Sequence, residues 1–156
     1  MEKVKNESRH VYEQLCKAAE GLVTNYEANR KEMSVCFEVE AKPFPLKFVV
    51  KIDANNDFVN FFVPLMINVP KKNRNSFARE ICRINFENMS LGYFSFHPET
   101  GRVVLCDDLI YRGSLISEET FETAITCMYD TACRYYEPLL HVSRADIQQG
   151  KSYDVT

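Results

Sequence analysis

Residues 91–111 read LGYFSFHPETGRVVLCDDLIY, and this stretch decides the fold that the rest of the chain must fit. It predicts a hairpin with strands at residues 91–97 and 102–111. The PETG sequence at 98–101 has turn chemistry, because Pro presets φ and Gly tolerates a positive φ at the exit. The hairpin therefore places two apolar strands side by side.

A helix with a wide apolar stripe follows this hairpin. It is predicted to begin at Ser117, a good N-cap, and to run to about Tyr136, with Pro138 kinking or ending it. Its apolar arc spans roughly 160°, so we expect more than one neighbour to cover it. The helix would cover one face of the hairpin. With His97 opposite Arg102, that face consists of Phe94, Phe96, Val103 and Leu105.

The upstream chain supplies two more helices and three more strands. A first helix is expected from about residue 8, or earlier, to residue 29, because apolar residues recur at three- and four-residue spacing. Alternating apolar residues predict strands at 33–40 and 46–52. A third strand at 58–67 is apolar on both faces, which is typical of a central strand. A second helix is expected to begin near Asn73 or Ser76.

The element order is therefore α-β-β-β-α-β-β-α. It predicts an α+β fold in which helices pack on a five-stranded antiparallel sheet. A chain of 156 residues suits one domain. We place that domain at residues 1–142 and a C-terminal tail at residues 143–156.

Composition and charge exclude several classes of function. The chain is 46% hydrophobic and 26% charged, which is typical of a globular protein and not of a disordered one. Its formal net charge of −3 argues against a nucleic-acid partner. The longest apolar run, at residues 58–69, is too short to span a bilayer, and the N-terminus is too polar for a signal peptide. We expect a cytoplasmic protein with no membrane partner.

The six cysteines show no CxxC spacing and no tight cluster with histidine. We expect free thiols, reduced and mostly buried, that behave as small hydrophobes. They are Cys16, Cys36, Cys82, Cys106, Cys127 and Cys133.

Asp107 and Asp108 are adjacent in a predicted strand, so one of them would face the core unless a bulge intervenes. One interpretation is a bulge or a strand end. The other is a cation or substrate site. Asp107 would lie about 17 Å along the strands from His97, so these two side chains could not share a metal.

The other candidate sites lack residues that their chemistry requires. His97 is a turn histidine. Residues 53–57 resemble the start of a calcium loop, but Phe58 and Pro64 stand where Gly and a bidentate Glu are needed. The basic residues at 71–74 lack interleaved aromatic residues and are better interpreted as a solvated helix start. No nucleotide-binding or hydrolase motif occurs, so we expect no catalytic residues, no cofactor and no metal.

Two stretches carry a resemblance to a known family. LGYFSFHPETGRV at residues 91–103 and ACRYYEPLL at 132–140 resemble the YbjN-type domain, a putative bacterial sensory transduction regulator. That family's fold is similar to type III secretion chaperones. The resemblance implies a small α+β interaction module, like the often dimeric chaperones that bind extended segments of a client protein. It implies no catalytic residues.

Three classes of function follow from these observations. The preferred one is a non-enzymatic, chaperone-like or regulatory module that binds a partner protein. The alternative is a small-molecule-sensing regulator with an internal pocket lined by Phe62, Phe94 and Tyr135. An enzyme is the third, and would need Asp107 or Asp108 in a cleft with a perturbed pKa.

Surplus apolar surface favours the protein-binding class. The broad stripe of the last helix and the two-sided strand at 58–67 exceed what one covered sheet face requires. An open sheet also has two edges to which an extended peptide could add. We expect a homodimer, or a monomer that binds a client segment, through apolar contacts. The predicted partner-binding residues are Phe62, Tyr129, Cys133, Tyr136 and Leu140.

Overall fold

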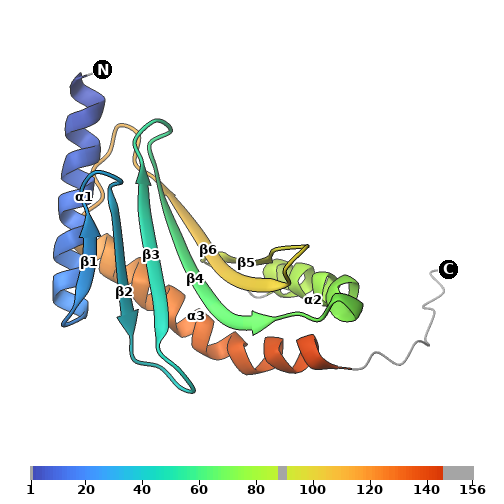
Figure 1. Ribbon diagram of the computed structural model, residues 1–156. Coiled ribbons are helices and arrows are strands. Elements are labelled where there is room, and N and C mark those ends of the chain that lie inside the picture. Colours follow the sequence, from blue (N-terminus) through green and yellow to red (C-terminus); the bar gives the residue numbers. More distant parts are fainter. Residues whose placement is uncertain (1, 88–90, 146–156) are drawn as a thin grey trace.

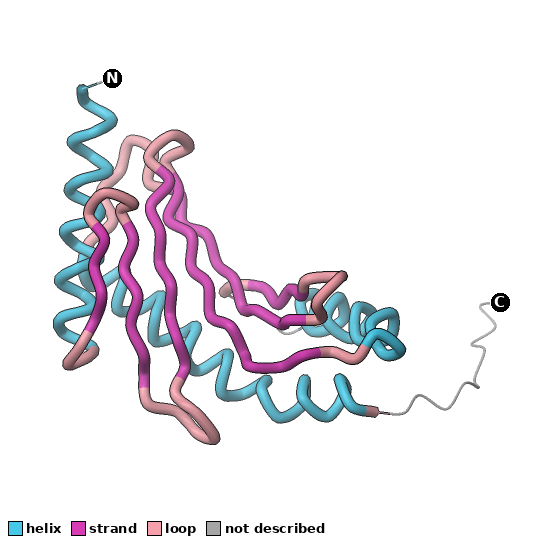
Figure 2. The backbone as a smooth tube through the Cα atoms, viewed as in Figure 1, coloured by secondary structure: helices cyan, strands magenta, loops and turns pink. Residues whose placement is uncertain are grey.

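The computed structural model describes residues 2–87 and 91–145, with side chains from residue 6 onward. Its α+β architecture, predicted from the sequence, is a single twisted sheet packed against three helices (Figures 1 and 2). The helices are α1 (Glu2–Leu22), α2 (Arg74–Glu87) and α3 (Glu118–Arg144), and a short 3-10 turn, η1 (Lys71–Asn73), precedes α2.

The sheet has six strands in the order β1-β2-β3-β4-β6-β5, and every neighbouring pair is antiparallel. The predicted antiparallel sheet is confirmed, but the predicted number of five strands is wrong. The strands are β1 (Tyr26–Asn29), β2 (Ser34–Val39), β3 (Leu46–Asp53), β4 (Phe58–Asn68), β5 (Tyr93–Phe96) and β6 (Arg102–Ile110).

The missed strand is β1, because α1 ends at Leu22 and not at residue 29. The side-chain oxygen of Asn29 accepts hydrogen bonds from the backbone N–H groups of Lys31 and Glu32, each at 3.1 Å. Such an Asx turn folds the chain back and lets β1 pair with β2. Three of the four β1 residues are exposed, so the strand carries no alternating apolar pattern that would have marked it.

The side chains of strand β4 alternate between the two faces of the sheet. Its odd-numbered residues, from Val59 to Ile67, are buried on what we call the inner face. Its even-numbered residues point the other way, to the outer face. The predicted central position of this strand is confirmed. The pairing with β6 shifts register between Pro64 and Asn68, because Pro lacks a ladder donor.

The β5–β6 hairpin has the predicted register. The His97 N–H donates to the Arg102 carbonyl at 2.9 Å, and Phe94 lies opposite Leu105. Gly101 adopts φ +76°, and a Cβ there would lie 2.3 Å from the Val69 carbonyl oxygen. Only glycine therefore fits this end of the turn.

Helix α3 covers the inner face and runs behind the sheet in the view of Figure 1. The predicted N-cap is confirmed, since Ser117 Oγ accepts a hydrogen bond from the Thr120 N–H at 3.2 Å. The helix does not end at Pro138 but continues to Arg144. It contacts α1, α2 and β4, so the prediction of several neighbours for its wide stripe is also confirmed. The remainder of the predicted tail, residues 146–156, lies outside the described residues.

Aromatic pairs fix α3 and α2 on the inner face. Phe121 of α3 lies 6.2 Å from Phe61, and Tyr135 lies 5.5 Å from Phe94, measured between ring centroids. Phe77 of α2 packs edge-on against Phe96 at 5.5 Å.

Helix α1 lies on the same side of the sheet. Its residues Val11, Leu15 and Ala18 are fully buried, as their spacing predicted. Its Ser8 hydroxyl lies 2.8 Å from the hydroxyl of Tyr111, just beyond β6. The described helices therefore all pack on one face of the sheet and leave the other uncovered.

Candidate protein-binding surface

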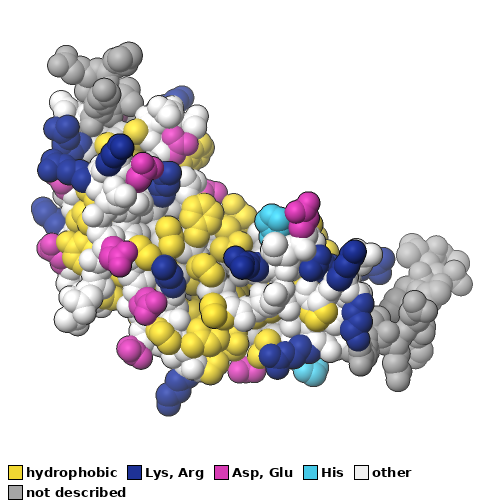
Figure 3. All heavy atoms as spheres, viewed as in Figure 1, with side chains coloured by type: hydrophobic (Ala, Val, Ile, Leu, Met, Phe, Trp, Pro, Cys, Tyr) yellow, Lys and Arg dark blue, Asp and Glu magenta, His cyan; other side chains and the backbone are white. Residues whose placement is uncertain are grey.

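The outer face carries an apolar row that crosses five strands. Direct cross-strand partners join its members one after another, so their side chains lie side by side. The row consists of Cys36, Val49, Phe62, Cys106 and Tyr93. Figure 3 shows hydrophobic side chains gathered over the middle of this face.

Large apolar side chains on this face remain open to solvent. Phe62 is 40% exposed and Tyr93 is 44% exposed, although both belong to strands of an ordered sheet. Met66 of β4 and Ile110 of β6 share the face and are exposed further, at 76% and 67%. Exposed apolar side chains that are contiguous, as Phe62 and Tyr93 are through Cys106, usually mark an interaction site.

A polar group borders the apolar row. Asn60 Nδ2 donates to one carboxylate oxygen of Asp108 at 2.6 Å, and the Tyr93 hydroxyl donates to the other at 3.3 Å. Partial burial and then the neighbouring Asp108 carboxylate raise the pKa of Tyr93, so its hydroxyl remains a donor at neutral pH. These contacts hold the Tyr93 ring in place at the rim of the surface.

Asp107 points the opposite way, into the core beside its cross-strand partner Phe61. It is 8% exposed, and its Oδ2 has no hydrogen-bond partner among the described residues. Burial raises the pKa of this carboxyl, against the opposing effect of the backbone N–H groups of Asp108 and Gly92. The predicted bulge or strand end at this pair is wrong, because β6 pairs with β4 without interruption from Val104 to Ile110.

The two aspartates do not form one site. Asp107 lies in the core and Asp108 on an open face, so the two carboxylates diverge. His97 Nδ1 faces the backbone N–H groups of Glu99 and Thr100 at 3.3 Å, where it caps the hairpin turn. Within residues 6–87 and 91–145, no three His, Cys, Asp or Glu side chains are placed to hold a metal ion.

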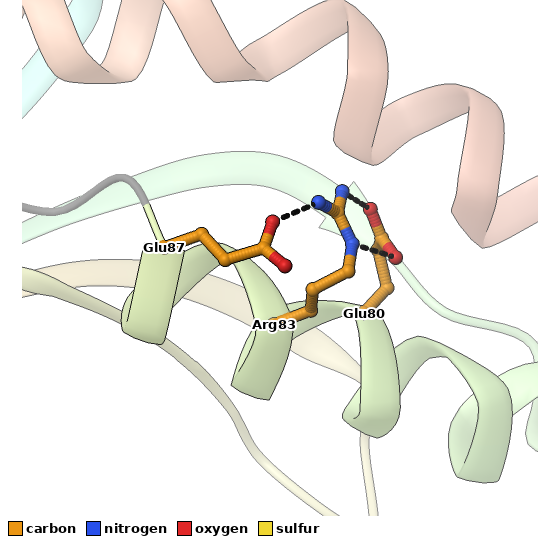
Figure 4. A network of polar contacts seen from close by, with 3 residues as sticks. All are labelled: Glu80, Arg83 and Glu87. Atoms are coloured by element: carbon orange, nitrogen blue, oxygen red, sulfur yellow. Dashed lines mark hydrogen bonds and ion pairs between the residues drawn. The ribbon is translucent and has the colours of Figure 1, made fainter.

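The basic residues near α2 have structural contacts. Arg74 donates to the carbonyls of Val69, Pro98 and Glu99 and so ties the start of α2 to the hairpin turn. Arg83 lies between Glu80 and Glu87 on the same helix and bonds both carboxylates, as Figure 4 shows. These arginines are therefore committed to local contacts.

The five predicted partner-binding residues fall into two separate groups. Phe62 lies on the outer face, whereas the other four lie on α3, on the far side of the sheet. The Tyr129 hydroxyl donates to the Glu40 carbonyl at 3.0 Å, and Tyr136 is buried against Phe44 at a ring distance of 4.9 Å. Of the four, only Cys133 is exposed, and Leu140 is half-buried.

The internal pocket predicted for a sensor is not formed by its three expected residues. Phe94 and Tyr135 contact one another on the inner face. Phe62 projects from the outer face, so the sheet lies between it and the other two rings. These three aromatic side chains, given as examples of such a lining, therefore do not face one common pocket.

Sequence reasoning proposed Phe62 as a surface residue but did not identify Tyr93, Met66 and Ile110, which are exposed on the same face. Alternation in β4 and β6 could have placed these residues on one face with Phe62. That inference also required the register between strands that are distant in sequence and the knowledge of which face the helices cover.

No family model and no curated protein matches this chain, so the YbjN resemblance stays a prediction. Among solved structures, a chain of the ExsC–ExsE complex is 16% identical, with a TM-score of 0.58 over 85% of this chain and 95% of that one. A chain of the HopA1–SchA chaperone–effector complex is 8% identical, with a TM-score of 0.59 over 83% and 95%. At these identities the likeness concerns the fold alone, and that fold is chaperone-like, as predicted.

Among the described residues, no helix is both long enough and apolar enough to cross a bilayer.

Proposed function

We propose that this protein is a non-enzymatic, chaperone-like interaction module that binds a partner protein on the outer face of its sheet. The observation that carries the proposal is the exposed apolar row through Phe62 and Tyr93, on a face that no described helix covers. Burial of such surface stabilises a complex by about 25 cal/mol per Å² of apolar area. The fold shared with chains of two protein complexes supports the same class of function.

The partner we propose is an extended segment of a client protein, as in type III secretion chaperones. Such a segment could add to a sheet edge by backbone pairing. The β5 edge is already occupied, because the Asn85 side chain bonds both the N–H and the carbonyl of Phe94, at 2.8 and 2.9 Å. Strand β1 is the other edge of the sheet, so we place strand addition there.

A homodimer is the second form of the same proposal, with a copy of the chain covering the outer face. Light scattering behind a sizing column distinguishes the two forms. A dimer mass that falls to a monomer mass in Phe62→Asp would support self-association through this face. The exposed side of α3 around Cys133 and Leu140 is a further proposed contact region.

A regulatory role, as in the YbjN-type family, would follow if binding sequesters the client. We place this activity in the cytoplasm, and the six unpaired cysteines support that choice.

The experiment that tests the proposal compares two variants with the same chemical change. Phe62→Asp puts a charge into the apolar row, and Phe86→Asp puts one at a 91% exposed position on α2. Affinity capture from the native host, followed by mass spectrometry, should recover the same partner with the wild type and with Phe86→Asp. Phe62→Asp should lose it.

Salt separates apolar binding from charge-driven binding. Capture should persist from about 50 to about 500 mM salt, because screening weakens exposed charge pairs and not apolar burial. Equal capture by both variants would refute the outer face as the binding surface.

A further inference from the structure

The outer face ends in a groove that suits a particular kind of client. Strand β1 pairs only with Ser34–Phe37, so β2 continues past the start of β1. A groove of about 980 Å³ lies at this corner of the sheet, between the turn that follows α1 and the end of β2. The groove exists because the edge strand is shorter than its neighbour.

The groove has apolar side chains in it. Leu22 is 39% exposed there, and Val23 and Val39 line it as half-buried residues. Cys36 belongs both to this lining and to the apolar row of the outer face. The groove therefore opens at the β1 edge of the sheet and adjoins the outer-face row at Cys36.

The charge around the groove is one-sided. Its lining contains four glutamates and a single lysine, Lys47. Glu20 accepts a hydrogen bond from the Tyr26 hydroxyl at 2.7 Å. The other three are also exposed, and their side-chain carboxylates form no hydrogen bond or ion pair with another described residue: Glu27, Glu38 and Glu40.

Strand alternation places Glu27 and Glu38 on the outer face, and Glu40 follows directly after the end of β2. Glu27 lies opposite Cys36, and Glu38 lies two residues further along β2, opposite Lys47. Figure 3 shows acidic side chains over this end of the sheet, beside the central hydrophobic side chains. Negative potential at one end of an apolar surface selects a ligand with the complementary pattern.

We propose that the client segment carries apolar side chains followed by lysine or arginine, with its apolar part on the row and its basic part over Glu27, Glu38 and Glu40. This inference rests on the proposed function and adds the chemistry of the partner and its direction across the sheet. The apolar contacts supply most of the affinity. The acidic groove discriminates between clients, because an exposed charge pair changes affinity only about 2- to 5-fold.

Three synthetic peptides test this pattern. Each has the same stretch of alternating leucine and serine, followed by a run of lysine, glutamine or glutamate, and each carries a fluorescent label. Anisotropy titrations with the full-length protein should give the tightest binding for the lysine peptide and the weakest for the glutamate peptide. We expect about a 10-fold preference for lysine over glutamine at low salt, as several exposed pairs combine. This preference should vanish at about 500 mM salt, where the Debye length is only a few Å.

A matched pair of variants tests whether the preference for the lysine peptide arises from the groove. The triple change Glu27→Gln, Glu38→Gln and Glu40→Gln should remove the preference and leave the affinity for the glutamine peptide unchanged. The control changes three exposed carboxylates elsewhere, Glu13→Gln, Glu119→Gln and Glu137→Gln, and should keep the preference.

The outcomes separate this inference from the proposed function. If all three peptides bind alike, and Phe62→Asp abolishes their binding, the outer face is the binding surface but the basic client is refuted. If the lysine preference survives the groove variant, the groove assignment is refuted. If no peptide binds, or if Phe62→Asp binds as the wild type does, the outer-face proposal and this inference both fail.

Discussion

Asp107 is a buried carboxylate whose ionisation should make the fold less stable, and Asp107→Asn tests this. The side chain is 8% exposed, and its Oδ2 lacks a hydrogen-bond partner within the described part of the chain. An unsatisfied buried polar group costs about 1–3 kcal/mol, and a charged one costs more. Asparagine keeps one acceptor oxygen for the backbone N–H groups of Asp108 and Gly92 and removes the charge. We therefore expect the variant to be more stable than the wild type by about 1 kcal/mol at neutral pH.

The pH dependence gives the sign of this effect independently. Burial raises the pKa of Asp107 in the folded state above its unfolded value, so the protonated form favours folding. This contribution is fully present below the unfolded pKa of about 3.9 and is lost as the pH rises through the folded pKa. The advantage of the variant should accordingly be near zero at about pH 4 and grow as the pH rises through the folded pKa of Asp107.

Urea denaturation followed by circular dichroism at several pH values measures this difference. Asp108→Asn is the matched control, because it makes the same change at the adjacent, exposed residue. That variant should retain the pH dependence of the wild type, since Asp107 is still present. If Asp107→Asn is less stable than the wild type by the same amount at every pH, the carboxylate has a stabilising partner and the reasoning is refuted.

Two further predictions concern the core and the thiols. Phe94→Ala should cost about 3–5 kcal/mol of unfolding free energy, because Phe94 is 1% exposed and packs on Tyr135. Phe86→Ala, at a 91% exposed position, should change it by less than about 0.5 kcal/mol, and equal costs would contradict the packing described. A thiol reagent should rapidly modify the exposed Cys82 and Cys133 in the native protein, which corrects the prediction that the thiols are mostly buried. Cys106 should react last, because burial and then the two neighbouring aspartates raise its pKa to about 11, and rapid modification of Cys106 in the native protein would contradict its buried position.

The hairpin and the central strand could be predicted from the sequence because their signals are local. The turn at 98–101 specifies the hairpin register, and the two-sided apolar pattern of β4 specifies its central place. Strand β1 could not be found this way, because it is short and its side chains are mostly exposed. It is a strand because the Asn29 turn lets it pair with β2.

The irregularity in the sheet also lies elsewhere than expected. Adjacent carboxylates at 107–108 suggested a bulge, yet the sheet keeps its register there and buries Asp107. The register shift follows Pro64 instead. A sequence pattern indicates that burying a polar residue is unfavourable. It does not show whether the folded strand will keep its register and bury that residue.

The proposed binding surface could be predicted only in part, for the same reason. Phe62 stood out as an apolar residue on the second face of a central strand, and its exposure agrees with a role at a surface. Tyr136 looked equally available on the α3 stripe, but Phe44 from a distant loop covers it. Which apolar residues remain uncovered depends on contacts between segments far apart in the chain, and no local pattern encodes them.

The most direct test of the central claim is hydroxyl-radical footprinting of the protein, alone and in complex with the partner protein that co-purifies with it. Side chains are oxidised according to their solvent exposure, so the method measures directly whether side chains of the outer face become covered. We expect oxidation of Phe62, Met66 and Tyr93 to fall in the complex, while the exposed Phe86 and Leu115 react as before. Unchanged oxidation of those three outer-face residues, with protection confined to α3, would contradict the outer face as the site where this protein binds its partner.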